Sequence, residues 1–570
     1  MAAVDGGHGA DPNRGTMFRS MPTGAALITS ALERAGVEVC FGLPGVHNLA
    51  LWDALRASPI RLVGVRHEQA AAYAADGYAR ATGRLGVALT TTGPGAANTL
   101  GGVGEAWASR SPVVVVATDI PSSLRRPGVY RGVLHETLDQ AAMFAPVTAG
   151  VRRAQPGDDL GALADEAIAR ARAASRPAYL EVPTDLLAAE SEDGLPAPPR
   201  GPDGARSVGA ARDQLARAVA LLEDAERPLV WAGGGARDAG TAVAARAERL
   251  AAPVLTTFGA RGLLPPEHPC AVGLPPHVEA AGRLWDEADA VIAVASDLDG
   301  MNTQNWAMPA PPRLVAVNRD PDDATKNYPA DVVLEGEAGA MTAALAAQLR
   351  PRDGLDTLAA RLQGARASVC GELDTAALRF LDAFAFAVPA DAVVVADMCI
   401  PGYWLAGFHA FARPRRLQYP MGWGTLGFAF PAALGAALAG TGPVVSVSGD
   451  GGFLYACGEL ATVAQERLPL TAVIVDDGGY GMLRYDQDLA GEARYGVDLE
   501  SPDFVALAAS FGLPAEGVEG LEDAFGEALA RHLADPEPSV LVTRTEALVP
   551  PPTTSPNWYR RRKPGGRLSS

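Results

Sequence analysis

The hydrophobic positions of the chain fall into short apolar runs separated by longer stretches of helical character. In the first third, strand-like runs lie at residues 37–41, 61–65, 86–90 and 112–117, and a last run ends near residues 179–183. Apolar runs of this length are typical of strands buried in a parallel sheet, whose two faces the intervening helices would cover. The pattern therefore predicts an α/β fold.

The same alternation recurs in two further blocks, so we expect three doubly wound parallel-sheet domains. The middle block begins at residues 228–235 with an apolar run that leads into three glycines, which is typical of a Rossmann-like domain. The last block contains apolar runs at residues 392–395, 444–447 and 472–475. No repeat of fixed period relates the blocks, so any similarity between them is one of architecture.

Segments rich in proline and glycine indicate the domain boundaries. We expect a flexible N-terminal tail at 1–20, a first domain at 21–190, a linker at 191–209, a middle domain at 210–350, a second linker at 351–375, a third domain at 376–548 and a C-terminal tail at 549–570. The C-terminal tail is proline-rich and then basic, which favours a disordered end. The alternative is a lid, in which Trp558 and Tyr559 cover a site and Arg560 or Arg561 attracts a carboxylate substrate.

Composition narrows the class of protein. A chain of 570 residues with 48% hydrophobic and 20% charged residues is typical of a large globular enzyme with several domains. The formal net charge of −18 argues against nucleic acid or an anionic membrane as a partner. Five cysteines without CxxC spacing fit reduced thiols and a cytoplasmic location. Residues 425–448 are uncharged, but Pro431 and Pro443 divide them into a buried helix and a buried strand rather than a membrane span.

Two acidic residues at the ends of neighbouring strands form the clearest candidate site. Asp450 directly follows an apolar run, and Gly451 and Gly452 would let the backbone approach an anion. The segment 453–465 is expected to be a helix whose first amides meet phosphate oxygens. Asp477 follows the next apolar run, and two carboxylates with a diphosphate between them suit Mg²⁺. The alternative is that the Asp-Asp-Gly-Gly sequence around Asp477 forms only a surface turn.

This pattern resembles the signature of thiamin-diphosphate enzymes, in which Gly-Asp-Gly is followed by a helix, a strand and Asn-Asn. Asp476 and Asp477 stand where the family usually has the two asparagines. The added charge beside the diphosphate should couple metal and cofactor affinity more tightly than usual. Glu68 lies in a segment that resembles the helix of the family's catalytic glutamate, and residues 41–45 and 90–98 resemble motifs of its acetolactate-synthase branch.

The resemblance implies how the chain would hold the cofactor between a pyrimidine-binding first domain and a diphosphate-binding third domain. Glu68 would hydrogen-bond the aminopyrimidine ring and promote its reactive tautomer, whereas a lone glutamate on a helix is usually only a solvated charge. Leu426 would bend the cofactor, and the carbonyl of Gly424 would accept a hydrogen bond from it. The implied metal ligands are Asp450, Asp477 and the backbone carbonyl of Gly479. The implied cofactor contacts are Glu68, Gly93, Gly424, Leu426, Asp450, Gly451, Gly452, Gly481 and Met482.

The positions expected to face the substrate depart from the family. His135 replaces the glutamine of a Phe-Gln-Glu motif, where it would shuttle protons or pack as an ordinary polar residue. His47 is the other histidine expected near the thiazolium ring, so Glu68, His135 and His47 are the candidate catalytic residues. Asp486 stands where acetolactate synthases carry a tryptophan that favours one acceptor. The expected substrate pocket consists of Val46, Tyr485 and Asp486.

The resemblance implies a reaction with thiamin diphosphate and Mg²⁺. A 2-oxoacid such as pyruvate would be decarboxylated, and the acyl anion equivalent would pass to a carbonyl acceptor. Simple decarboxylation to an aldehyde, or cleavage of a 2-hydroxy ketone, is the alternative, and a relative that only binds the cofactor is a third. The expected partners are small 2-oxoacids and further copies of the chain, since the family forms its sites between subunits of dimers or tetramers. FAD, which the acetolactate-synthase branch holds in its middle domain, is not favoured because the expected basic residues are not evident at residues 295–300.

Overall fold

The computed structural model describes residues 21–190, 208–546 and 548–553 of the chain. The expected N-terminal tail, most of the first linker, and the tail residues Trp558, Tyr559, Arg560 and Arg561 lie outside the described residues. The lid alternative therefore stays a prediction.

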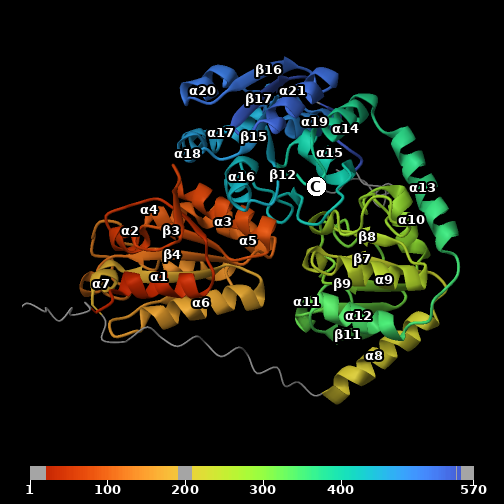
Figure 1. Cartoon of the computed structure of the whole chain (residues 1–570), viewed down its shortest axis with the longest axis horizontal. Helices are drawn as coiled ribbons and strands as arrows, with labels where there is room; N and C mark the ends of the chain where they lie inside the picture. Colours follow the sequence, from red (N-terminus) through yellow and green to blue (C-terminus); the bar gives the residue numbers. More distant parts are fainter. Residues whose placement is uncertain (1–20, 191–207, 547, 554–570) are drawn as a thin grey trace, which may run out of the picture.

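The first domain is built on six parallel strands in the order β2-β1-β3-β4-β6-β5. The strands are β1 (Val39–Gly42), β2 (Arg61–Gly64), β3 (Gly86–Thr90), β4 (Val113–Asp119), β5 (Val151–Arg153) and β6 (Ala178–Pro183). The helices are α1 (Gly24–Arg34), α2 (Leu49–Arg56), α3 (Glu68–Thr82), α4 (Pro94–Asn98), α5 (Leu100–Ala108), α6 (Leu160–Ala174) and α7 (Thr184–Ala188). Because helices cover both faces, β3, β4 and β6 are buried along their whole length, which explains their unbroken apolar runs (Figure 1).

The middle domain has a five-stranded parallel sheet in the order β11-β10-β9-β7-β8. Its strands are β7 (Pro228–Ala232), β8 (Val254–Thr256), β9 (Ala290–Val294), β10 (Leu314–Asn318) and β11 (Val332–Glu335). Its helices are α8 (Val208–Glu223), α9 (Gly240–Leu250), α10 (Glu279–Glu287), α11 (Pro321–Thr325) and α12 (Ala338–Gln348). The strand order changes direction between β7 and β9, which is where open α/β sheets commonly bind ligands.

The third domain has six parallel strands in the order β13-β12-β14-β15-β17-β16. Its strands are β12 (Val393–Ala396), β13 (Leu417–Gln418), β14 (Val444–Gly449), β15 (Leu470–Asp476), β16 (Ala515–Glu519) and β17 (Ser539–Arg544). Its helices are α14 (Thr375–Ala387), α15 (Ile400–Phe408), α16 (Ala429–Leu438), α17 (Asp450–Leu454), α18 (Leu460–Glu466), α19 (Gly481–Ala490), α20 (Phe504–Ser510) and α21 (Asp523–Ala534).

The first and third domains share one topology. Numbered within its own domain, each sheet reads 2-1-3-4-6-5. The predicted fold class, three doubly wound parallel-sheet domains, is confirmed. Residues 425–448 contribute α16 and β14, and among the described residues no helix is long and apolar enough to cross a membrane.

Two segments differ from the sequence-based expectation. Residues 453–465 do not form one helix, because α17 ends at Leu454 and a short 3-10 turn, η6 (Cys457–Glu459), precedes α18. The expected second linker contains an 18-residue helix, α13 (Leu355–Glu372), which runs along the outside of the molecule from the middle to the third domain (Figure 1).

The first and third domains pack directly on each other through α3 and α16. A Cβ added to Gly77 would lie 2.0 Å from the carbonyl oxygen of Ala432, and one added to Gly435 would lie 1.8 Å from that of Ala74. The two backbones therefore approach as closely as glycine allows. Residues of both domains join one hydrophobic core around this contact, including Tyr73 and Phe428, whose rings meet edge to face at 5.7 Å.

Candidate active site

Glu68 lies at the carboxyl edge of the first sheet, beside the loop that follows β3. It is the first residue of α3 and only 8% exposed, and its Oε2 accepts a hydrogen bond of 2.9 Å from Nδ2 of Asn98. A Cβ added to Gly95 would lie 3.3 Å from Glu68 Oε1. Glu68 and the loop at residues 93–95, which are separated in the sequence by strand β3 and most of α3, therefore meet in space.

The two candidate histidines lie side by side at the same edge. The ring centroids of His47 and His135 are 5.6 Å apart, edge to face. Gly93, at φ +64°, makes room for this arrangement, since a Cβ there would lie 2.6 Å from the carbonyl oxygen of His135. His135 itself has φ +68°, a strained conformation for a residue with a side chain and one often found at functional sites. Burial, and then the neighbouring His135, lower the pKa of His47.

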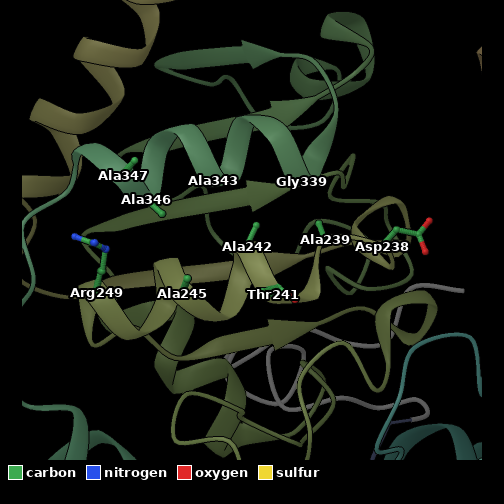
Figure 2. Close-up of a pocket in the computed structure, with 10 residues that line it drawn as sticks. All are labelled: Asp238, Ala239, Thr241, Ala242, Ala245, Arg249, Gly339, Ala343, Ala346 and Ala347. Atoms are coloured by element: carbon green, nitrogen blue, oxygen red, sulfur yellow. The ribbon is translucent and has the colours of Figure 1, made fainter.

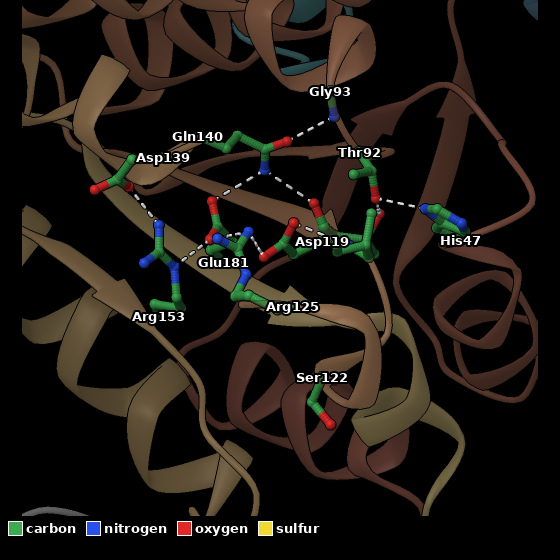
Figure 3. A network of polar contacts seen from close by, with 12 residues as sticks. His47, Thr92, Gly93, Asp119, Ser122, Arg125, Asp139, Gln140, Arg153 and Glu181 are labelled. Carbon is green, nitrogen blue, oxygen red and sulfur yellow. Dashed lines mark hydrogen bonds and ion pairs between the residues drawn. The ribbon is translucent and has the colours of Figure 1, made fainter. Parts of the chain in front are cut away.

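A buried network of hydrogen bonds holds the loop after β3 in place at this edge of the sheet (Figure 3). Oε1 of the fully buried Gln140 accepts a hydrogen bond of 2.6 Å from the amide of Gly93. Its Nε2 lies within hydrogen-bond distance of the Thr118 carbonyl, the Tyr179 hydroxyl and Glu181 Oε2. Sequence patterns gave no sign of Gln140, because its partners come from three different segments.

The candidate metal ligands are at the carboxyl edge of the third sheet. Asp450 begins α17 directly after β14, and Asp477 follows the adjacent strand β15. A Cβ added to Gly451 would lie 2.6 Å from the Tyr480 ring, and one added to Gly481 would lie 2.5 Å from Asp477 Oδ2. The start of α17 and the loop that begins at Asp477 are therefore in direct contact.

Both carboxylates have an atom that fits a cation. Oδ1 of Asp450 and Oδ1 of Asp477 are buried and accept no hydrogen bond. Burial raises the pKa of Asp450, and burial together with the Asp450 carboxylate raises the pKa of Asp477 to about 6. A divalent cation between two such oxygens would favour the ionised form of both. Within the described residues no three His, Cys, Asp or Glu side chains form a metal cluster, so the ion would need the Gly479 carbonyl and a bound diphosphate as well.

Arg484 lies beside Asp477 and offsets part of its negative charge. Its Nη1 donates to the Asp477 carbonyl at 2.7 Å and lies 3.8 Å from Asp477 Oδ1, while its Nε donates to Asp498 at 2.7 Å. The expected tighter coupling of metal and cofactor affinity is not tested by these contacts and stays a prediction. The Gly479 carbonyl, the third candidate ligand, accepts a backbone hydrogen bond from Gly481 at 3.2 Å and keeps a second lone pair.

The loop with the candidate residues Gly424 and Leu426 joins β13 to α16 and is held from two domains. Glu105 of α5, fully buried, accepts from the Trp423 amide at 3.2 Å and the Thr425 hydroxyl at 2.9 Å. At the other end, the buried Asp397 accepts from the first amides of α16. Sequence patterns did not identify Glu105 or Asp397 as part of the site.

The remaining residues expected at the site lie near Glu68 in the first domain or near Asp450 and Asp477 in the third. Gly452 belongs to α17, and Met482, Tyr485 and Asp486 belong to α19. Asp486 is exposed, and partial burial raises its pKa. Val46, 60% exposed, precedes His47 on the loop between β1 and α2.

The middle domain has a separate cavity of about 1130 Å³ between its strand ends and the first domain. Several cations around it are already paired: Arg110 and Lys326 bind Asp323, and Arg415 binds Asp238. The cavity supplies volume, but these pairs leave less free positive charge for a flavin diphosphate; the expectation that the middle domain holds no FAD is not tested. A second hollow of about 510 Å³, between α9 and α12, is lined mostly by alanines (Figure 2).

Three family models account for the three domains. They describe the N-terminal, central and C-terminal domains of thiamine pyrophosphate enzymes and match residues 22–143, 215–345 and 398–543. A probable 2-ketoarginine decarboxylase of Pseudomonas aeruginosa is 37% identical over 89% of this chain and 91% of its own length. A probable acetolactate synthase large subunit of Methanocaldococcus jannaschii is 30% identical, over 96% and 94%, and the acetolactate synthase of Mycobacterium bovis is 32% identical, over 89% and 86%.

Fold and family models together define the class: a three-domain enzyme whose outer domains are those that bind thiamin diphosphate in this class. The chain belongs to the thiamine pyrophosphate enzyme family, in the branch that resembles acetolactate synthase.

Proposed function

We propose that the protein binds thiamin diphosphate with Mg²⁺ and decarboxylates a 2-oxoacid. The observation that carries the proposal is a pair of buried carboxylate oxygens, one on Asp450 and one on Asp477, that accept no hydrogen bond. Both are hard ligands at adjacent strand ends, the place where a parallel sheet holds a phosphate-bound cation. Thiamin diphosphate, when bound, supplies the carbanion chemistry that allows a 2-oxoacid to lose CO₂.

The chain's own residues would orient that group. Asp450, Asp477 and the Gly479 carbonyl hold the metal, Gly451, Gly452, Gly481 and Met482 surround the diphosphate, and Gly424 and Leu426 set its conformation. Glu68, beside Gly93, would hydrogen-bond the pyrimidine ring. These two groups of residues would meet between subunits, so we propose a homodimer or homotetramer.

For the fate of the acyl group, we propose protonation and release as an aldehyde. His47 and His135 support this step because two adjacent rings, 5.6 Å apart, can hold and pass a proton at the substrate edge. Burial and the neighbouring His135 lower the pKa of His47, which favours the neutral form of that ring.

Transfer of the acyl group to a carbonyl acceptor is the second candidate. It is favoured by the acetolactate synthases among the relatives, which match nearly the whole chain. Product analysis separates the two fates: aldehyde as the main product supports protonation, and acetolactate or acetoin from pyruvate supports transfer.

We also propose that the donor carries a positive charge at its far end. Asp486 forms no ion pair in the described part of the chain, and a carboxylate in the expected pocket would attract a guanidinium or ammonium group. The name of the 37% identical relative, a probable 2-ketoarginine decarboxylase, agrees with this substrate class.

Two experiments test these proposals. Calorimetry should detect thiamin diphosphate binding that needs Mg²⁺ and is lost in Asp450→Ala; no binding to folded protein would refute the cofactor assignment.

The substrate class is tested in turnover assays. Asp486→Asn should lower kcat/KM for 5-guanidino-2-oxopentanoate by roughly 10- to 100-fold, which corresponds to one charged hydrogen bond, and should change kcat/KM for 2-oxohexanoate little. Asp488→Asn, two residues along α19 and paired with Arg494, is the matched control.

A further inference from the structure

A carboxylate of the third domain holds the backbone directly before Glu68. Oε1 of Glu459 accepts hydrogen bonds from the amides of Arg66, at 2.9 Å, and His67, at 3.0 Å. Glu459 is 1% exposed and lies in η6, the turn between α17 and α18. One buried side chain therefore ties the start of α3 to the segment that follows Asp450.

The hydrogen bonds around Glu459 all point toward its carboxylate. Oε2 accepts from the Thr462 hydroxyl at 2.6 Å, so both oxygens have donors. Burial raises the pKa of Glu459, whereas these donors and the Arg66 charge lower it. A negative group here also lies at the positive end of the α3 dipole.

The first turn of α3 is thus fixed from two sides. His67 caps the helix from within, since its Nδ1 accepts from the Gln69 amide at 3.2 Å. Glu459 fixes the incoming chain from outside. Glu68 directly follows the two amides that Glu459 binds, so this contact holds the backbone from which the Glu68 side chain leaves.

We propose that Glu459 is a positioning residue that sets the orientation of Glu68. The role of Glu68 toward the cofactor rests on the function proposed above, whereas the contact itself does not. A second link between the same domains, the ion pair of Arg61 with Glu466 at 2.8 Å, is more exposed and joins β2 to α18 rather than to α3. It provides a matched control.

The first test uses the protein without cofactor. Amide hydrogen exchange, followed by mass spectrometry on peptides that cover residues 64–72, should be roughly tenfold faster or more in Glu459→Leu, because a hydrogen bond to a charged group is lost. Glu459→Gln keeps the amide-accepting oxygen and should stay within about threefold of the wild type. Glu466→Leu should leave these peptides unchanged. Equal exchange in Glu459→Leu and Glu466→Leu would overturn the proposal.

The second test uses the holoenzyme. In Glu459→Leu, the rate of hydrogen exchange at the reactive carbon of thiamin diphosphate and kcat should fall together by roughly tenfold or more, with cofactor affinity and KM little changed. Glu459→Gln should restore most of this loss. A loss of cofactor affinity with an unchanged exchange rate would contradict a role in orienting Glu68.

A milder variant covers the case in which Glu459→Leu does not fold. Thr462→Val removes one donor to Glu459, but the Thr462 hydroxyl also lies 3.5 Å from the Gly64 carbonyl. Exchange is therefore compared over residues 66–72, where it should rise selectively relative to peptides of α6; uniform change in both would count against the proposal. If the exchange results hold but no thiamin diphosphate binds, the contact stands and the proposed function fails.

Discussion

At the scale of single residues, Gln140 is the most completely bonded side chain near the candidate site. Replacing it with leucine leaves the Gly93 amide and Glu181 Oε2 without this partner. Each buried group left unpaired costs about 1–3 kcal/mol, so Gln140→Leu should unfold at clearly lower urea concentration. It should also weaken thiamin diphosphate binding, because Gly93 is displaced. Gln348→Leu, an exposed glutamine at the end of α12, should change neither; a neutral Gln140→Leu would show that the network does not hold the loop.

A second residue-scale prediction concerns Asp477. Asparagine at this position removes the added charge but keeps an oxygen ligand, and Arg484 keeps its ion pair with Asp498. Thiamin diphosphate affinity in Asp477→Asn should therefore depend less on Mg²⁺, with the ratio of dissociation constants at low and saturating Mg²⁺ reduced by roughly tenfold. Titrations of both proteins at the two Mg²⁺ concentrations measure this ratio. An unchanged ratio would mean that Arg484 already neutralises Asp477.

At the scale of elements, the contact between α3 and α16 depends on two glycines. A methyl group on Gly435 would lie 1.8 Å from a backbone carbonyl oxygen, which cannot move away as a flexible side chain can. Gly435→Ala should therefore destabilise the protein by about 1–3 kcal/mol or more through overpacking. Gly364→Ala, within α13 and with no atom near its new methyl group, should be neutral or slightly stabilising. Chemical denaturation compares the two; equal effects would show that the helices can separate without cost.

The strands, and with them the site at their ends, were the part of this structure that sequence could predict. Each buried strand is a local apolar run, and a parallel sheet brings the ends of such runs to one edge, so Asp450 and Asp477 were expected together. The adjacency of His47 and His135, and the hydrogen bonds of Gln140 and Glu459, depend on contacts between segments far apart in the chain. The break between α17 and α18 was missed for the same reason, since Glu459 in η6 finds its partners in the first domain.

At the scale of the whole molecule, the middle domain is fastened to both outer domains by charged groups. Arg110 of the first domain pairs with Asp297 and Asp323 of the middle domain, and Arg261 of the middle domain donates to the His409 carbonyl of the third at 2.9 Å. The His409 ring, whose pKa the Arg261 charge helps to lower, is a titratable group at the boundary between the middle and third domains.

His409 allows the pH dependence of stability at this domain boundary to be tested. Burial, and then the charge of Arg261, lower the pKa of His409 from an unfolded value near 6.5 to about 4. Since the unfolded chain binds the proton more readily, the stabilisation is present above pH 6.5 and is lost as the pH falls toward 4, by roughly 3 kcal/mol. His409→Phe keeps the aromatic contacts with Phe384 and Phe411 but removes the titration. In urea unfolding followed from neutral pH down to about pH 4, the variant should gain stability relative to the wild type only below about pH 6.5. Above that pH the difference should be flat, and a difference that does not vary with pH would mean that His409 is protonated alike in the folded and unfolded chain.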